Sequence, residues 1–183
     1  MNPDFGDPAK TVLDLLTRAA NDRRSPLRWP VLATRGDDDG WPGARMLVVR
    51  AFDRTTLQIE LHTDRRSAKC AALQTDPACA LLFFDKGAMV QLRVDGRARV
   101  HAGGDPAADA AFARAPEGSL DDYRGPPPGA APDAPGSDDA RANFAAIRIS
   151  LERADLLKIS RDGHQRAFID FRSEPPTVRG AAP

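Results

Sequence analysis

The sequence predicts a mainly β protein, an antiparallel barrel or sandwich with a few flanking helices. From Ala44 onward, apolar residues recur with a period of two in the runs ARMLVVRAF, LQIELHT, ACALLFF, AMVQLRV and RARVHA. Turn residues separate these runs, for example at 53–56 and at Asp95–Gly96. Strand patterns return near the C-terminus in NFAAIRISL, DLLKIS and RAFIDF. Because strands follow one another with few helices between them, an antiparallel sheet is favoured over a parallel one.

Length and charge restrict the class of protein. The chain has 183 residues, 26 basic and 26 acidic side chains, and a formal net charge of zero. The length predicts a single domain over residues 1–183. The composition of residues 125–140 predicts a Pro/Gly-rich loop, and residues 173–183 are expected to form a short tail. The charge disfavours a nucleic-acid binder, and no apolar run reaches the roughly 18 residues of a membrane span. Since the start also lacks a secretory signal pattern, a cytoplasmic protein is expected.

Three helices are expected to flank the sheet. Residues 8–23 have apolar residues at helical spacing, with Asp7 as a capping residue and proline at the first position. Residues 67–75 and 106–114 show shorter helical patterns. The octet at 36–43, GDDDGWPG, is expected to form a solvated hairpin turn because it lacks the ligand spacing of a calcium loop.

No residue pattern indicates metal or hydrolytic chemistry. The cysteines, Cys70 and Cys79, match neither a disulfide framework nor a zinc site, so no metal is expected. His62, His101 and His164 stand far apart in the sequence, and none lies in a hydrolase or metalloprotease motif. Glycine-rich nucleotide-binding motifs are also missing from the sequence.

The zero net charge hides an uneven distribution. Residues 45–69 carry six basic and three acidic side chains, whereas residues 101–140 carry two basic and eight acidic ones. Within the basic stretch, Arg45 and Arg50 flank four apolar residues, which cover both faces of a strand. We therefore expect one central strand here, with the two arginines at its ends and on opposite faces of the sheet.

The same stretch predicts an anion site at a helix N-terminus. After the strand that ends at His62–Thr63, a turn leads into the helix that Ser67 is expected to cap. Free backbone N–H groups and the helix dipole favour a negative charge at this point. The side chains that could assist are Thr63, Arg65, Arg66, Ser67 and Lys69. From the residues alone, a phosphate site and a solvated basic turn paired with Asp64 are equally supported.

A larger set of residues resembles a known family. It comprises RMLVVR at 45–50, HTDRRSAK at 62–69, the D-P-x-x-x-L-L-F pattern at 76–83, Gln91, Gly96, Tyr123, Pro128–Gly129, Asn143–Phe144 and GHQRAF at 163–168. This set is similar to the pyridoxamine 5′-phosphate oxidase-like flavoproteins, and especially to a poorly characterised side branch rather than to the vitamin B6 oxidase proper. The resemblance extends from about Arg45 to Phe168.

The resemblance implies an FMN-binding split β-barrel of Greek-key type that acts as a homodimer, with two flavin sites at the subunit interface. It also implies which positions contact FMN, by their match to the family's motifs. These cofactor positions are Arg45, Met46, Leu47, Arg50, His62, Thr63, Arg66, Ser67, Lys69, Gln91 and Arg166. Weaker matches to substrate-binding positions are Arg50, Tyr123 and His164. The chemistry would then be that of the flavin, which the protein positions and tunes.

Several positions depart from the vitamin B6 oxidase. That enzyme has an arginine two residues before the histidine that matches His164, and this chain has Asp162 there. Because an aspartate repels a phosphate, turnover of pyridoxamine phosphate is not expected. Ala68 stands where a second basic residue often precedes the lysine, and Leu156 stands where the oxidase has a tryptophan. Flavin binding is expected to survive these changes, whereas the substrate stays unassigned.

The sequence is compatible with two functions of different kinds. One is an FMN-dependent oxidoreductase that acts on an unassigned small molecule. The other is a non-catalytic flavin-binding, small-molecule-binding or sensor protein of the same fold, because no acid–base residue stands out. A single-stranded nucleic-acid binder is disfavoured, since it needs aromatic stacking residues and most of the eight Phe residues occupy apolar strand positions.

Overall fold

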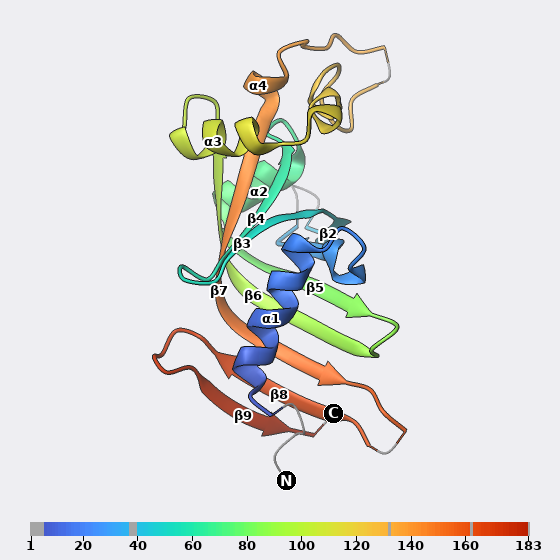
Figure 1. Ribbon diagram of the computed structural model, residues 1–183. Coiled ribbons are helices and arrows are strands. Elements are labelled where there is room, and N and C mark those ends of the chain that lie inside the picture. Colours follow the sequence, from blue (N-terminus) through green and yellow to red (C-terminus); the bar gives the residue numbers. More distant parts are fainter. Residues whose placement is uncertain (1–5, 37–39, 132, 162, 183) are drawn as a thin grey trace.

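The computed structural model describes residues 6–36, 40–131, 133–161 and 163–182. A long curved sheet carries one helix along its inner face and a group of short helices at one end (Figure 1). The strands are β1 (Val31–Thr34), β2 (Gly43–Met46), β3 (Val49–Asp53), β4 (Gln58–Asp64), β5 (Ala78–Asp85), β6 (Val90–Ala102), β7 (Phe144–Lys158), β8 (Gln165–Asp170) and β9 (Thr177–Ala181). The helices are α1 (Pro8–Asn21), η1 (Pro26–Arg28), α2 (Ala68–Thr75), α3 (Pro106–Arg114), η2 (Glu117–Ser119), η3 (Asp121–Tyr123) and α4 (Ala140–Asn143).

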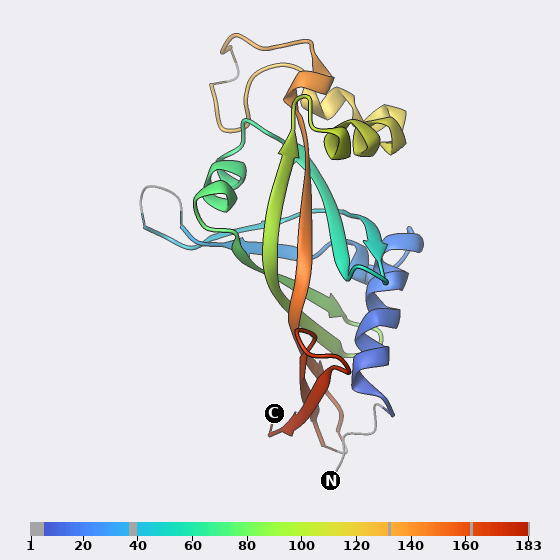
Figure 2. The same ribbon diagram turned by 90° about the vertical axis from the view of Figure 1, so that its left-hand side faces the viewer.

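The strand pairs in the described residues are antiparallel, as the sequence predicts. Along the sheet the order is β2-β1-β5-β6-β7-β4-β3, with β8 paired to β7 and β9 paired to β8. Only Leu47 and Val48 connect β2 to β3, although these strands lie at opposite ends of that order. Such a connection spans at most about 11 Å, so the sheet must curl until its two ends are close. The sheet does not close, and the fold is an antiparallel split β-barrel (Figure 2).

Strand β7 joins the two parts of the split sheet. Its first half, up to Ser150, pairs with β4, and its second half, from Arg153, pairs with β8. On its other side it pairs with β6 over nearly its whole length. In Figure 1, β7 therefore runs from the short helices at the top to the β8–β9 hairpin at the bottom.

Helix α1 packs against the inner face of the sheet. Asp7 caps its N-terminus, since the carboxylate accepts the backbone N–H of Lys10 at 3.0 Å, as expected. The helix ends at Asn21, two residues before the expected end. Val12 and Leu16 are fully buried in the main core, together with apolar residues of β5, β6 and β7. Each such side chain contributes about 1.5–3 kcal/mol through burial.

A lobe, which we call the cap, lies over one end of the sheet. It consists of the described part of residues 103–143 and contains α3, η2, η3 and α4. Its Pro/Gly-rich loop is joined at its base by a β-bridge between Gly125 and Ser137. A second apolar cluster attaches the cap to β7, where Phe112 and Tyr123 lie edge-on to Phe144 with ring centroids 5.4 and 5.1 Å away. The outer face of β7 is thus covered at this end.

The stretch from Arg45 to Arg50 is not one central strand. It is divided between β2 and β3, which lie at the two edges of the sheet order. The chain leaves the ladder at Leu47 and Val48 because it crosses there from one end of the curled sheet to the other. Leu47 packs against the main core, so an apolar residue is needed although no strand continues. A crossing at the barrel edge therefore shows the same apolar pattern as a central strand.

Some residues that the sequence predicts to be turns, strand ends or a tail lie within strands of the sheet. Asp95–Gly96 lies within the continuous strand β6 and is not a turn, and the β-bulge opposite it is in β7, where Glu152 is the extra residue. A Cβ on Gly96 would lie 2.3 Å from the carbonyl oxygen of Ser150, so this glycine permits a close approach of β6 and β7. NFAAIRISL and DLLKIS belong to the single strand β7. Within the expected tail at 173–183, β9 extends the sheet by pairing with β8.

The expected turn at 36–43 lies between β1 and β2, which pair as a hairpin. Its three aspartates lie outside the described residues. Within the part of the chain that the structure describes, no helix is long and apolar enough to cross a lipid bilayer.

Candidate functional site

The turn from β4 into α2, which we call the α2 turn (Thr63–Lys69), brings several predicted positions together. Lys69 Nζ donates to Thr63 Oγ1 at 3.0 Å, so the ammonium group lies between the strand end and the helix start. Ser67 occupies the N-cap position, but its hydroxyl donates to the Asp64 carbonyl oxygen at 2.6 Å and does not cap the helix. The start of α2 therefore has no side-chain cap, and the N–H of Cys70 donates to the carbonyl oxygen of Ser67 at 2.9 Å.

Asp64 pairs with Arg66 inside this turn. Its buried carboxylate accepts from Nε and Nη2 of Arg66 at 3.0 and 2.6 Å, and this hydrogen bonding raises the pKa of Arg66. Arg66 also donates to the carbonyl oxygen of Gly125 at 3.0 Å, which ties the turn to the cap loop. The pairing with Asp64 that the sequence left open therefore exists. Lys69 and the exposed Arg65 supply the remaining positive charge of the turn.

The donor groups of the α2 turn fit a phosphate group. Phosphate oxygens are strong acceptors, and the turn offers the Lys69 ammonium group, the Thr63 hydroxyl and the positive end of the α2 dipole. Thr63, Ser67 and Lys69 come together as expected. Arg66 lies beside them, but its guanidinium group is engaged by Asp64.

The three predicted positions around β2 lie at a neighbouring edge of the sheet. Arg45 donates from Nη1 to Thr34 Oγ1 on β1 at 2.7 Å. Met46 is 63% exposed, while Leu47 packs partly against the main core. Because β1 pairs with β2 and also contacts α2, these positions lie on the same side of the fold as the α2 turn.

Arg50 and His62 lie on the opposite face of β4 from Thr63. Side chains alternate along a strand, so His62 points outward, where its ring lies edge-on to Phe144 with centroids 4.8 Å apart. Here a pocket of about 270 Å³ opens between α1, β3, β4 and α3, and we call it the arginine pocket. Its lining residues are Ala20, Asn21, Arg23, Arg28, Arg50, Ala51, Glu60, His62, Arg114 and Pro116.

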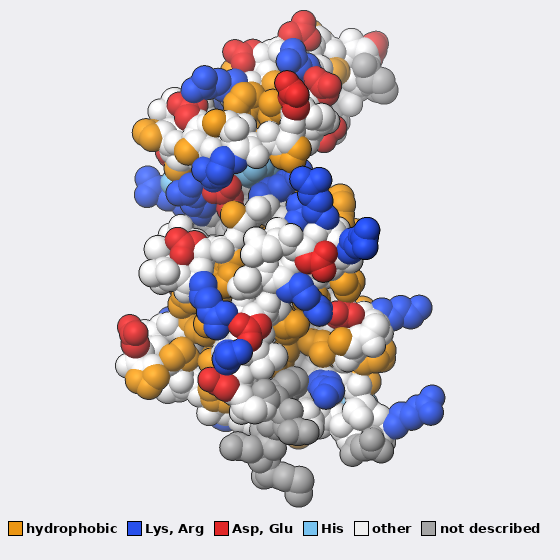
Figure 3. Space-filling model, in the orientation of Figure 1, with side chains coloured by type: hydrophobic (Ala, Val, Ile, Leu, Met, Phe, Trp, Pro, Cys, Tyr) orange, Lys and Arg blue, Asp and Glu red, His pale blue; other side chains and the backbone are white. Residues whose placement is uncertain are grey.

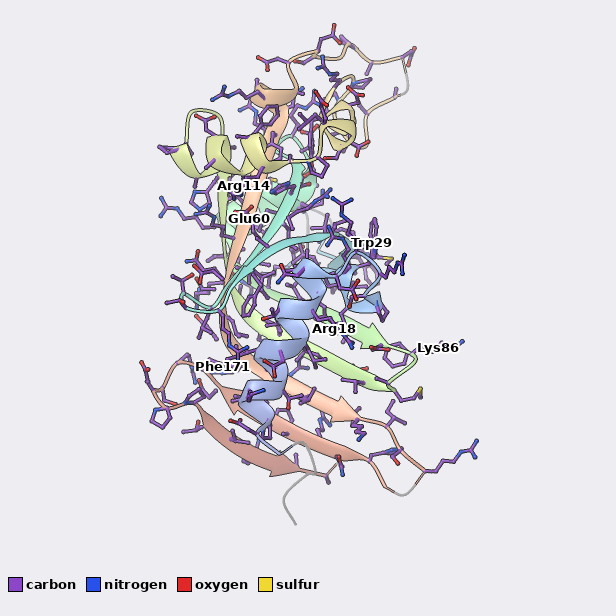
Figure 4. The ribbon with its side chains drawn as sticks, in the orientation of Figure 1. Arg18, Trp29, Glu60, Lys86, Arg114 and Phe171 are labelled. Carbon is purple, nitrogen blue, oxygen red and sulfur yellow. The ribbon has the colours of Figure 1, made fainter. Side chains whose placement is uncertain are left out.

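Glu60 is the acid in the wall of the arginine pocket, beside Arg114 and beneath α3 (Figure 4). Its side chain is buried and accepts from His62 Nε2, Arg114 Nη2 and Arg148 Nε, each at 3.1 Å. Burial opposes ionisation of Glu60. The hydrogen bonds from His62 and Arg148 and the nearby positive charges outweigh burial and lower the pKa of Glu60 to about 2.

The other two predicted substrate positions do not line the arginine pocket, although Tyr123 lies close enough to Arg50 for that charge to act on its phenol. Tyr123 is buried in the cap cluster, and this burial raises the pKa of its phenol. His164 is exposed in the β7–β8 connection, where its Nδ1 accepts the backbone N–H of Ser160 at 3.2 Å. Asp162 lies outside the described residues. One chain therefore does not gather the three positions into a single substrate site.

Gln91 and Arg166 form a separate group at the far end of the sheet. Both lie opposite Leu157 of β7, Gln91 on β6 and Arg166 on β8. Thr63 lies opposite Ala145, twelve residues earlier on the same strand. A strand of that length spans roughly 40 Å. One chain therefore cannot bring both groups of predicted cofactor positions to one small ligand.

Four charged residues of the arginine pocket were not predicted from the sequence: Arg23, Arg28, Glu60 and Arg114. They come from four separate places in the chain: the segment after α1, η1, β4 and the end of α3. No motif links them, and 22 of the 26 basic residues are arginine, so no single arginine stands out. The available signal is the alternation along β4, which places Glu60 on the same face as His62.

The fold is shared with several solved structures. A pyridoxamine 5′-phosphate oxidase-related, FMN binding protein from Nostoc punctiforme has a TM-score of 0.79 at 21% identity, covering 97% of this chain and 98% of its own. PhzG from Burkholderia lata, solved in complex with tetrahydrophenazine-1-carboxylic acid, has a TM-score of 0.71 at 17% identity, covering 100% and 98%. A Clostridium acetobutylicum protein related to general stress protein 26 has a TM-score of 0.57 at 13% identity, covering 86% and 94%.

The sequence itself matches a family model. No curated protein matches the chain. The model described as pyridoxamine 5′-phosphate oxidase, FMN-binding domain, matches residues 10–102, which is just over half of the chain and includes the α2 turn and the β2 edge. The chain therefore belongs to the pyridoxamine 5′-phosphate oxidase family and carries its FMN-binding domain.

Proposed function

We propose that this protein binds FMN and acts as an oxidoreductase on a small molecule. The observation that carries the proposal is the α2 turn, in which Lys69, Thr63 and the uncapped start of α2 face one another within the matched FMN-binding domain. A dianionic phosphate at this position would meet a positive charge and several donors at once. The oxidoreductase part is supported by the family, whose description names an oxidase.

In this proposal the protein positions the cofactor and FMN supplies the electron transfer. Lys69 and Thr63 would hold the phosphate group, and the first N–H groups of α2 would add to the charge complementarity. Asp64 keeps Arg66 on the cap side of the turn by accepting from its Nε and Nη2, so that Arg66 fixes the turn to the cap loop. Arg45 is held in place by Thr34 and would contact the cofactor from the β2 edge.

We further propose that two copies of the chain build each flavin site. The distance of roughly 40 Å along β7 between Thr63 and the row of Gln91 and Arg166 supports this arrangement. Arg166 is held by Asp155 through hydrogen bonds of 2.9 and 2.8 Å, which present its guanidinium group at the outer face of the sheet. In a dimer this face can reach the α2 turn of the other copy.

The outer face of the sheet also has the character of an interface. Met46, Leu82 and Phe84 are large apolar side chains that are 63%, 40% and 45% exposed. Met46 and Leu82 share a row across β1, and Phe84 lies directly opposite Gln91. An exposed apolar surface of this kind is typically covered by a partner, and a second copy is the commonest one.

The visible absorption spectrum of the purified protein tests the proposal. Purified protein is expected to be yellow and to release FMN on denaturation, whereas colourless protein that takes up no added FMN contradicts the proposal. Stopped-flow mixing of the flavin-loaded protein with NADH, NADPH and a panel of small-molecule substrates then tests the oxidoreductase part. A flavin that is bound but reduced by none of them supports the non-catalytic alternative.

A further inference from the structure

We propose that the arginine pocket binds a small organic anion, a carboxylate or a phosphate, at a site separate from the α2 turn. This assigns Arg50 and His62 to a ligand other than the flavin phosphate. The inference goes beyond the proposed function and does not require flavin binding, because it rests on the charges and the unpaired atoms of the pocket itself.

The pocket concentrates positive charge that the surrounding residues do not neutralise. Among the described residues that line it, Glu60 is the single acid, and one histidine and two arginines already donate to its oxygens. Arg28 donates to the backbone carbonyl oxygen of Ala20 at 3.0 Å. Within the described part of the chain, neither Arg23 nor Arg50 forms an ion pair with a carboxylate. A bound anion would supply the missing negative charge.

The pKa of Arg28 reflects the nearby positive charges of the pocket. Burial, together with the nearby charges of Arg50 and Arg23, lowers the pKa of Arg28, and Asp22 offsets the effect only in part. The carboxylate of Asp22 already accepts the backbone N–H of Arg24 at 2.8 Å. Three guanidinium groups that repel one another around a hollow favour an anion between them.

Two buried polar atoms also point to a ligand. Arg50 Nε and His62 Nδ1 are buried and have no hydrogen-bond partner among the described residues. The side chain of His62 is 3% exposed, and its other ring nitrogen, Nε2, lies 3.1 Å from Glu60. Buried polar groups in folded proteins are almost always paired, so two unpaired atoms lining one pocket indicate a missing partner.

The same atoms restrict the chemistry of the ligand. Arg50 Nε–H needs an oxygen acceptor, and the planar guanidinium group matches both carboxylate and phosphate oxygens. Because the ionised Glu60 can only accept, His62 Nε2 is the donor of that pair, and Nδ1 is an acceptor in the neutral ring or a donor in the imidazolium. A hydrogen phosphate group or a hydroxy acid offers acceptor oxygens together with an O–H group for Nδ1. The volume of about 270 Å³ restricts the ligand to a small molecule.

The position of the pocket is suited to a ligand that joins the cap to the body of the protein. Arg114 comes from the cap and Arg23 from the segment after α1, so the two sides of the pocket belong to different parts of the fold. Figure 3 shows Lys and Arg side chains gathered at the constriction where the cap meets the body. A bound anion would therefore be held from both sides.

Isothermal titration calorimetry of the purified protein tests this inference, with sodium phosphate and sodium lactate as probes and sodium chloride at equal ionic strength as the reference. We expect saturable binding of at least one probe. Arg23→Gln should weaken that binding by about tenfold or more, because one charge-assisted hydrogen bond is lost. Arg50→Lys keeps the positive charge and removes the Nε–H donor, and it should also weaken binding. Arg54→Gln, a half-exposed arginine paired with Asp14, is the matched control and should change nothing.

Lys69→Gln separates the two anion sites, because it lies in the α2 turn and should leave probe binding intact. If Lys69→Gln abolishes binding and Arg23→Gln does not, the anion occupies the α2 turn and the inference is wrong. Failure of both probes to bind the wild-type protein also overturns it. Flavin content is read from the visible absorption of the same samples, so a failure of the proposed function is seen independently of a failure of the anion pocket.

Discussion

Glu60 connects three elements through a single carboxylate. Its oxygens accept from His62 on the same strand, from Arg114 in α3 and from Arg148 in β7. The carboxylate is therefore a structural link between the cap and the sheet as well as the acid of the arginine pocket. Removing the charge of a buried, hydrogen-bonded group of this kind is destabilising, because two arginines lose their counter-charge and one of the two acceptor oxygens becomes a donor.

Replacement of Glu60 by glutamine should make stability less dependent on acid pH. The folded protein lowers the pKa of Glu60 from 4.5 to about 2, so the group stabilises the fold above pH 4.5 and loses this effect as the pH falls toward 2. Urea unfolding at pH 7 should show wild-type protein roughly 2–3 kcal/mol more stable than Glu60→Gln. This difference should shrink between pH 5 and pH 2. A difference that is constant over this range would contradict the assignment, and Glu117→Gln in the exposed part of the cap serves as the control.

Lys69 is the residue on which the proposed phosphate contact depends most. Lys69→Met should weaken FMN binding by about tenfold or more, since a charge-assisted hydrogen bond to phosphate is lost. Riboflavin, which has no phosphate, should bind the variant and the wild-type protein equally. Fluorescence titration with both flavins measures the two affinities. Arg54→Met is the matched control, because Arg54 is a half-exposed cation that pairs with Asp14 outside the α2 turn. Equal losses for both flavins would show that Lys69 does not contact the phosphate.

At the scale of elements, the sequence predicts local features well and long-range geometry poorly. The capped start of α1, the bounds of α3 and the N-cap position of Ser67 all depend on neighbouring residues and are found as expected, although the Ser67 hydroxyl does not cap α2. The crossing at Leu47–Val48 was not predictable, because only the curled sheet distinguishes it from a strand. The arginine pocket could not be predicted from the sequence either, because Arg28 and Arg114 are brought together only by the packing of separate elements.

Gly96 shows how a turn pattern can conceal a strand contact. The Asp-Gly pair resembles a hairpin turn, yet in the fold β6 continues through it, opposite a bulge at Glu152 of β7. Gly96→Ala would place a Cβ against the backbone of Ser150, which cannot move without disturbing the ladder. We expect a loss of about 2–3 kcal/mol in the free energy of unfolding. Gly118→Ala, with open space around the added methyl group, should change it by less than about 0.5 kcal/mol. Equal effects in thermal or urea unfolding would contradict this account of the bulge.

At the scale of the whole molecule, the predicted cofactor positions divide into two groups at opposite ends of β7. The outer face between them carries the exposed side chains of Met46, Leu82 and Phe84. If this face forms the proposed dimer interface, Phe84→Glu should yield a monomer in light scattering and should lower the flavin content, because a buried unpaired charge opposes association. Ala110→Glu, at an exposed position of α3, should leave the dimer intact. A Phe84→Glu protein that is monomeric but fully loaded with flavin would refute a shared site.

A mixed dimer distinguishes a shared flavin site from a site within one chain. Lys69→Met and Arg166→Gln homodimers should each bind little FMN, since every site lacks one of its two contacts. In a heterodimer of the two variants, purified through two different affinity tags, one site combines the intact Lys69 of one chain with the intact Arg166 of the other, and the second site carries both defects. The heterodimer should therefore recover about half of the wild-type flavin content. If Lys69 and Arg166 acted within the same chain, every site would keep one defect and the heterodimer would remain as poor in flavin as its parents.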